Sequence, residues 1–187
     1  MKKVFALALA SVCLAAAVPK KPKLIVTIVL DQFRFDYLSR YRSEFKGGLH
    51  RLLTQGAVFA DAHYIHVPTL TAVGHSTMLS GATPTVSGII ANEWYDREEG
   101  AAVTSVSDKT TKLLGGAPAI GASPRRMLVD TIGDEIKIAG GKSRTIGVSL
   151  KDRSAILPLG RTGDGAYWFD TQTGAVVTST YYADDLP

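Results

Sequence analysis

A run of apolar and β-branched residues, Leu24 to Leu30 (LIVTIVL), is the feature that most constrains how this 187-residue chain can fold. Its nearly unbroken apolar character predicts a strand that is buried on both faces, as in the centre of a parallel sheet. Asp31 follows directly, at the carboxyl end of the predicted strand, which is the edge where open α/β sheets bind ligands. Its carboxylate has two interpretations that stay open here, a ligand or the cap of a following helix.

The rest of the chain alternates helical and strand patterns, which predicts an α/β sandwich around a mostly parallel central sheet with β-hairpin insertions. Helical spacing from Leu38 to Leu53, interrupted at Gly47-Gly48 and stopped at Gly56, predicts a helix whose aromatic residues are core. The other expected elements are a strand from Ala57, a hairpin after Asn92, a helix from Ser123-Pro124 to Gly140-Gly141, a buried strand within Arg144–Leu150, and a hairpin from Tyr167 to Tyr182.

Residues 1–17 have the pattern of a secretory signal peptide, with a basic start, an apolar run of about 14 residues and small residues before Val18. The run is shorter than the ~20 residues of a membrane span, so no stable membrane insertion is expected. We therefore expect a periplasmic or secreted protein, cleaved near Ala17, with one domain over residues 18–187. Cys13, the only cysteine, lies in this leader, which excludes disulfides and zinc–thiolate sites from the mature chain.

The net charge of the mature chain is small. Lys2 and Lys3 lie in the leader, so 19 of the 21 basic residues remain against 17 acidic ones, a formal charge of +2. The basic residues are scattered, and the one cluster, Lys20 to Lys23, is interpreted as a solvated segment after the cleavage site. The charge gives no reason to expect nucleic acid as a partner.

The segment from Val67 to Asn92 (VPTLTAVGHSTMLSGATPTVSGIIAN) places Thr71 at the mouth of a short predicted helix. A hydroxyl there either caps free backbone N–H groups or is aimed at an anion that those groups help to hold. His75 lies one turn further, and we interpret it as a residue with a structural hydrogen bond. His63 and His66 are interpreted as loop histidines with ordinary hydrogen bonds.

Asp31, Thr71, Asn92, Lys151 and Arg153 all fall at ends of predicted strands or helices, so the topology brings them toward one edge of the sheet. Together they suit a phosphoryl ester. Thr71 offers a nucleophile, and a metal held partly by Asp31 would lower the pKa of its hydroxyl. Asn92, Lys151 and Arg153 offer donors and cations for the phosphoryl oxygens. Each residue alone has an ordinary structural explanation, and only their joint appearance supports this chemistry.

Several segments resemble the alkaline phosphatase superfamily, namely IVLDQFRFDYL, the Val67–Asn92 segment continued by EWYD, SPRRMLVDTIGDEIK and GVSLKDRSAILPLGRTGDGAYWFD. The resemblance is to the N-terminal part of its threonine-nucleophile branch, which includes nucleotide pyrophosphatase/phosphodiesterases and the phosphate-irrepressible type of bacterial alkaline phosphatase. It implies two zinc ions, with Asp31 and Thr71 as metal ligands and Thr71 as the nucleophile. It also implies that Asn92, Lys151 and Arg153 bind the phosphate of a small ester substrate.

The lysine–arginine pair favours phosphate monoesters, because the phosphodiesterase members lack it and a dianionic phosphoryl group carries the extra charge that the pair neutralises. Two alternatives remain open, a phosphodiesterase or nucleotide pyrophosphatase in which the pair is incidental, and a non-catalytic phosphate-binding fragment.

The later zinc ligands of the family are an aspartate followed four residues on by histidine, an Asp-His pair and a further histidine. None of them is present, since all four histidines precede Asn92. We therefore expect a truncated chain that is inactive or nearly so alone and prone to aggregate.

Overall fold

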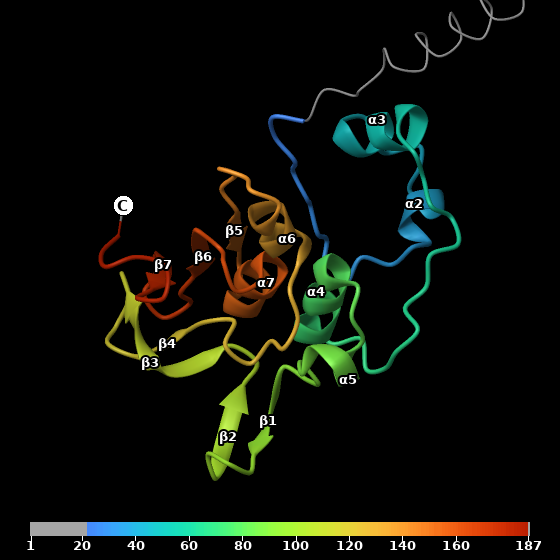
Figure 1. Ribbon diagram of the computed structural model, residues 1–187. Coiled ribbons are helices and arrows are strands. Elements are labelled where there is room, and N and C mark those ends of the chain that lie inside the picture. The colour runs from blue at the N-terminus through green and yellow to red at the C-terminus, as the bar shows by residue number, and fades with distance from the viewer. Residues whose placement is uncertain (1–21, 187) are drawn as a thin grey trace, which may run out of the picture. The chain divides into compact units, whose positions relative to one another are not determined.

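The computed structural model describes residues 22–186 and divides the chain into two compact units, residues 1–56 and residues 57–187. Figure 1 traces both units, whose positions relative to one another are not determined. The predicted signal peptide, residues 1–17, lies outside the described residues. Among residues 22–186, no helix has the length and apolar character needed to cross a membrane.

The first unit contains two short helices, α2 (Tyr37–Arg40) and α3 (Gly48–Gln55). Gly47 precedes α3 and Gly56 follows it, so the predicted interruption and stop of this helical region are confirmed. Neither helix contains a buried residue, and Tyr41 is 39% exposed. The prediction that the aromatic residues here are core is therefore wrong, because helical spacing identifies a shared face but not whether another element covers it.

The apolar run from Leu24 to Leu30, predicted as a buried strand, forms no strand. Leu24 and Ile28 expose 77% and 76% of their surface. A strand is held by ladder hydrogen bonds to a neighbour, and no described residue pairs with this run. The prediction is wrong because the apolar pattern shows a preference for burial and does not provide the pairing strand. Residues from Ala57 also form no strand.

The second unit carries the sheet and the helices that cover it. Its helices are α4 (Thr71–Ser80), α5 (Pro84–Ser87), α6 (Ile132–Ile138), α7 (Asp152–Ile156) and the 3-10 helix η1 (Leu157–Leu159). Its strands are β1 (Glu93–Asp96), β2 (Ala101–Thr104), β3 (Ser107–Leu114), β4 (Ile120–Ala122), β5 (Ile146–Ser149), β6 (Gly165–Phe169) and β7 (Val176–Ser179). The two predicted hairpins are confirmed as the antiparallel pairs β1–β2 and β6–β7.

The larger sheet has the strand order β4-β3-β7-β6-β5, while β1 and β2 form a separate ribbon. β5 and β6 are parallel, with Ile146 opposite Gly165 and Val148 opposite Tyr167. The other pairs in this sheet are antiparallel, so the described strands form a mixed sheet rather than a mostly parallel one. A parallel pair requires a crossover connection, and α7 with η1 provides it between β5 and β6. The predicted strand–helix–strand alternation is confirmed at this point.

Helices cover one face of the sheet. α7 contacts β5 and β6, and α4 contacts α7 and η1 (Figure 1). Ala166 and Val177 on the covered face are fully buried. Gly147 allows α7 to approach, because a Cβ there would lie 2.1 Å from the carbonyl oxygen of Ala155. Val148, which points to the opposite face, is 76% exposed. The strand predicted within Arg144–Leu150 is thus confirmed, whereas its predicted burial is wrong.

Helix α6 begins at Ile132 and not at the predicted Ser123-Pro124. The hydroxyl of Ser123 donates instead to the buried carboxylate of Asp108 at 2.6 Å. The oxygen of the same hydroxyl accepts the amide of Arg125 at 3.2 Å, but the amide of Leu128 then donates to the carbonyl oxygen of Ser87 at 2.9 Å, so this turn does not continue as a helix. The helix ends at Ile138, which confirms the predicted stop before Gly140-Gly141.

Asp134 is a fully buried carboxylate in α6 that holds the loop after η1. It accepts hydrogen bonds from the hydroxyl and amide of Thr162 at 2.7 and 2.8 Å, and from the amides of Thr131 and Arg161 at 2.9 and 3.2 Å. Burial raises the pKa of Asp134, but these hydrogen bonds outweigh burial and hold the pKa below its ordinary value of 3.8.

Asp134→Ala should lower the free energy of unfolding by about 3 kcal/mol in urea denaturation at neutral pH, because it leaves buried amides without an acceptor. Since the folded pKa is depressed, the contribution of Asp134 is present above its unfolded pKa, about 4, and is lost as the pH falls through the folded pKa.

The matched control is Asp130→Ala, which removes an ion pair with Arg161 (2.9 Å) between partly exposed side chains and should cost less than about 1 kcal/mol. Equal losses of unfolding free energy in the two variants would contradict the role of Asp134 as the buried acceptor for these amides.

Candidate active site at the start of helix α4

Thr71 is the first residue of α4, and the N-cap position before it is occupied by Leu70. Leucine has no side-chain acceptor for the first amides of the helix, and Thr71 itself is not the cap residue. Ala72 and Val73, which follow, are fully buried and fix the start of the helix in the core. Thr71 is partly buried.

The side chain of Asn92 supplies the cap for α4. Its Oδ1 accepts a hydrogen bond from the amide of Ala72 at 2.9 Å. Because a backbone N–H only donates, the oxygen end of the carboxamide faces the helix, and the two hydrogens on Nδ2 are the donors that remain. The side chain of Asn92 therefore lies beside the peptide group that joins Thr71 and Ala72.

The backbone of Asn92 is held as well. Its carbonyl accepts the amide of Ser105 at 2.9 Å, and Ser105 is fully buried. Ser105 lies between β2 and β3, so the β1–β2 ribbon returns to Asn92. Arg126 fixes the far end of the ribbon by ion pairs with Asp96 at 2.7 Å and Glu99 at 2.5 Å. The position of Asn92 is thus set by the ribbon as well as by α4.

Lys151 and Arg153 follow β5, with Lys151 directly before α7 and Arg153 inside it. Lys151 is exposed, whereas Arg153 is partly buried with its Nη1 3.5 Å from Oδ1 of Asp152. α7 packs against α4, so Lys151 and Arg153 lie at the start of a helix that contacts the one carrying Thr71 (Figure 1). Their predicted place at the carboxyl end of a strand is confirmed.

Asp31 lies in the first unit, in an exposed turn after Leu30. Its predicted place at the end of a buried strand is wrong, because no strand precedes it. The structure brings Thr71 and Asn92 together within the second unit and does not place Asp31 relative to them.

The metal ligands expected from the sequence do not form a metal site. Within residues 22–186, no three or more histidine, cysteine, aspartate or glutamate side chains are grouped so that they could hold a metal ion. Zinc usually takes three or four protein ligands, and Asp31 and Thr71 would supply two. The described residues therefore do not fit a zinc site.

The histidines near Thr71 differ from one another. His63 forms an ordinary hydrogen bond with Asp61 at 2.7 Å on the surface, as predicted. For His66 that prediction is wrong, because both ring nitrogens are buried without a partner among the described residues. His75 is 5% exposed, and its Nδ1 bonds to the carbonyl oxygen of Thr71 at 2.8 Å, which confirms its predicted structural hydrogen bond.

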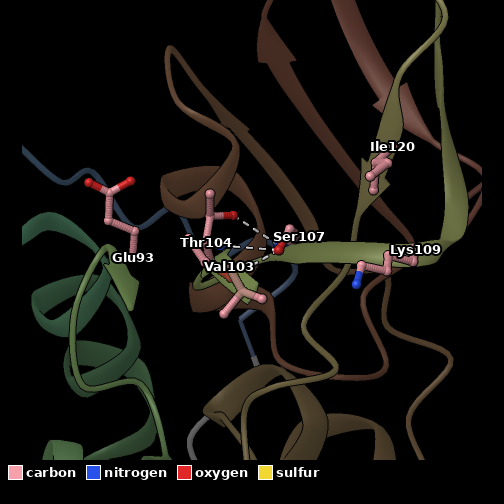
Figure 2. A pocket seen from close by; sticks show the side chains of 7 residues that line it. Glu93, Val103, Thr104, Ser107, Lys109 and Ile120 are labelled. Carbon is pink, nitrogen blue, oxygen red and sulfur yellow. Dashed lines mark hydrogen bonds between the residues drawn. The ribbon is translucent and has the colours of Figure 1, made fainter. Parts of the chain in front are cut away.

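A shallow cavity of about 180 Å³ lies beside the β1–β2 ribbon (Figure 2). Thr104 and Ser107 at its base bond to each other, since each side-chain oxygen accepts the amide of the other residue, at 3.0 and 3.1 Å. The lining residues are Glu93, Ala102, Val103, Thr104, Ser107, Lys109 and Ile120. No predicted site residue lines this cavity, so it adds no residue to the candidate site.

The sequence model of the type I phosphodiesterase / nucleotide pyrophosphatase family matches residues 25–182. The chain belongs to this family. The matched range contains every predicted site residue, namely Asp31, Thr71, Asn92, Lys151 and Arg153.

Two similar proteins are named alkaline phosphatases. PafA of Elizabethkingia meningoseptica is 45% identical over 175 residues, which are 91% of this chain and 32% of that protein. PhoV of Synechococcus elongatus is 44% identical over 170 residues, which are 89% of this chain and 31% of that protein. The chain thus spans about a third of the length of these relatives.

A solved structure confirms the alkaline-phosphatase-like α/β fold. It is a PafA mutant with a threonine, an asparagine, a lysine and an arginine replaced. The match has a TM-score of 0.85 at 42% identity and covers 91% of this chain and 34% of that chain.

The use of the Asn92 side chain as the cap of α4 was not predicted from the sequence. One signal for it exists, because Leu70 cannot cap the helix, so the acceptor has to come from outside the helix. Nothing in the sequence shows that this acceptor lies 20 positions after Ala72.

Proposed function

We propose that this chain is a portion of an exported, metal-dependent phosphomonoesterase, which acts through a phosphothreonine formed on Thr71. The observation that carries the proposal is the hydrogen bond between Asn92 and the amide of Ala72, which puts a side-chain donor beside Thr71. Export rests on the leader over residues 1–17, with cleavage near Ala17 and a periplasmic or secreted location.

The PafA mutant supports the same residues. Its replaced threonine and asparagine are 21 positions apart, and its replaced lysine and arginine are two positions apart. Thr71 and Asn92, and Lys151 and Arg153, have the same two spacings in this chain. These shared residue types and spacings support Thr71, Asn92, Lys151 and Arg153 as the site residues of this chain.

The proposed reaction has two balanced steps. The hydroxyl oxygen of Thr71 forms a bond to phosphorus and gives its proton to solvent, while the bond from phosphorus to the ester oxygen breaks and that oxygen takes a proton from solvent to leave as an alcohol. Water then attacks the phosphothreonine, which releases inorganic phosphate and restores the threonine hydroxyl. Asn92 would donate to a phosphoryl oxygen, and Lys151 and Arg153 would neutralise its charge.

The described residues provide only part of a metal site. Zinc is proposed from the resemblance, with Asp31 and Thr71 as ligands, and those two oxygens are fewer than a zinc site takes. No step is therefore assigned to the metal. We propose that the ligands that complete it lie outside the described residues and that the 187-residue chain alone is nearly inactive.

Two rival functions remain. A phosphodiesterase or nucleotide pyrophosphatase would use Thr71 and Asn92 in the same way, with Lys151 and Arg153 incidental. A non-catalytic phosphate-binding protein would bind the anion at the same place without turnover. The presence of the cation pair on α7, packed against α4, favours the monoesterase.

The chain with added zinc should hydrolyse p-nitrophenyl phosphate more slowly than roughly one turnover per second, the low end for ordinary enzymes. Thr71→Ala should abolish this hydrolysis because it removes the nucleophile, whereas the control Thr173→Ala, in an exposed turn, should keep it. A Thr71→Ala variant as active as the wild type would rule out the phosphothreonine. Wild-type turnover above about one per second would rule out the near-inactivity of this chain.

Lys151→Ala and Arg153→Ala should each lower the residual rate on a monoester about 10- to 100-fold, the effect of losing one charge-assisted hydrogen bond. The rate on bis-p-nitrophenyl phosphate should fall less than about threefold, because a diester monoanion has less charge to neutralise. Lys142→Ala, an exposed lysine near β5, is the control. Equal losses on the two substrates would favour the diesterase.

A further inference from the structure

We propose that His75 is a positioning residue for Thr71, acting with Asn92 to hold the peptide group between Thr71 and Ala72 from both sides. The inference rests on the proposed function, in which Thr71 is the nucleophile. It adds His75 to that site, which the sequence analysis interpreted only as a residue with a structural hydrogen bond.

The first half of this contact is the His75 ring. Its Nδ1 lies 2.8 Å from the carbonyl oxygen of Thr71. A carbonyl oxygen only accepts, so Nδ1 carries the hydrogen, and in the neutral ring the other nitrogen is an acceptor. A carbonyl has two lone pairs, so this bond adds to the backbone bond that a helix makes at the same oxygen. His75 is 5% exposed, so the contact is shielded from competing water.

The second half is the Asn92 side chain. It accepts the amide of Ala72 at 2.9 Å. The carbonyl of Thr71 and the amide of Ala72 belong to one planar peptide group, so two side chains from different parts of the chain hold the same plane. That plane is joined to the Cα of Thr71 through the torsion ψ of Thr71, so holding the plane limits the directions that the Cα–Cβ bond of Thr71 can take.

This arrangement has a consequence for catalysis. A displacement at phosphorus needs the attacking oxygen in line with the departing one, and a misplacement of about 1 Å can cost about 100-fold in rate. At the first residue of a helix, where few backbone bonds act, a doubly held peptide keeps the nucleophile in one direction. A histidine that served only to fill space would need its ring but not its Nδ1 donor.

Two variants of His75 separate the effect of its Nδ1 hydrogen-bond donor from the effect of its ring. His75→Phe keeps a ring and removes the donor, whereas His75→Asn keeps an N–H donor near the position of Nδ1 and removes the ring. His63→Phe, in the exposed loop before α4, is the control with the same substitution.

Two readouts are taken on the full chain below its melting temperature. One is the rate of Thr71 phosphorylation by p-nitrophenyl phosphate with zinc, followed by peptide mass spectrometry after an acid quench. The other is amide hydrogen exchange at Ala72, measured by NMR. His75→Phe should slow phosphorylation and accelerate exchange at Ala72, each by about tenfold or more, and His75→Asn should restore both.

Wild-type values in His75→Phe, or failure of His75→Asn to restore them in a folded protein, would overturn the proposal. If wild-type Thr71 is never phosphorylated while exchange at Ala72 follows the expected order, the phosphothreonine step fails in this chain and the hold on the peptide stands. If His75→Phe does not fold, the ring of wild-type His75 decides, because a hydrogen on Nε2 instead of Nδ1 in the ¹⁵N spectrum contradicts the contact.

Discussion

The hydrogen bond from the Ala72 amide to Asn92 is the contact on which the candidate site depends. Helix α4 begins after a leucine that cannot cap it, so the first amides need an acceptor from elsewhere. Asn92 provides one and is itself fixed by the amide of Ser105. One side chain thus caps the helix with its oxygen and lies beside Thr71, and its NH₂ group remains as a hydrogen-bond donor. Stability and the proposed phosphate chemistry therefore require the same residue at this position.

The sequence predicted local elements better than their partners. The β1–β2 and β6–β7 hairpins and the glycine stops at Gly56 and Gly140 depend on nearby residues, and the structure confirms them. The Leu24–Leu30 strand depends on a pairing strand that the described residues do not contain, and it was wrong. The start of α6 was also wrong, because the amide of Leu128, just after Ser123-Pro124, bonds to the carbonyl oxygen of Ser87 and not within a helix. The periodicity of apolar residues does not show which residues far apart in the sequence contact each other.

The candidate site shows the same division. Residue types and order grouped five residues as one set, namely Asp31, Thr71, Asn92, Lys151 and Arg153. The structure places Asn92 beside Thr71 and the cation pair at the start of the adjacent α7, and it does not place Asp31 relative to them. What the pattern did not contain is which atoms face each other. The carboxamide oxygen of Asn92 faces the helix, and His75 contacts the carbonyl of Thr71 rather than a substrate. The metal half of the site remains a proposal, because the described residues do not group enough ligands.

The central claim is that the start of α4 binds a phosphate anion with Asn92 as donor. The most direct measurement is an NMR titration of the ¹⁵N-labelled chain with inorganic phosphate. The account predicts that the Asn92 side-chain amide and the Thr71 backbone amide shift together and saturate. It also predicts that Asn92→Asp, which keeps an acceptor for Ala72 but adds a negative charge, removes the response at Thr71. Unchanged resonances at both residues, or saturable shifts confined to another part of the chain, would contradict it.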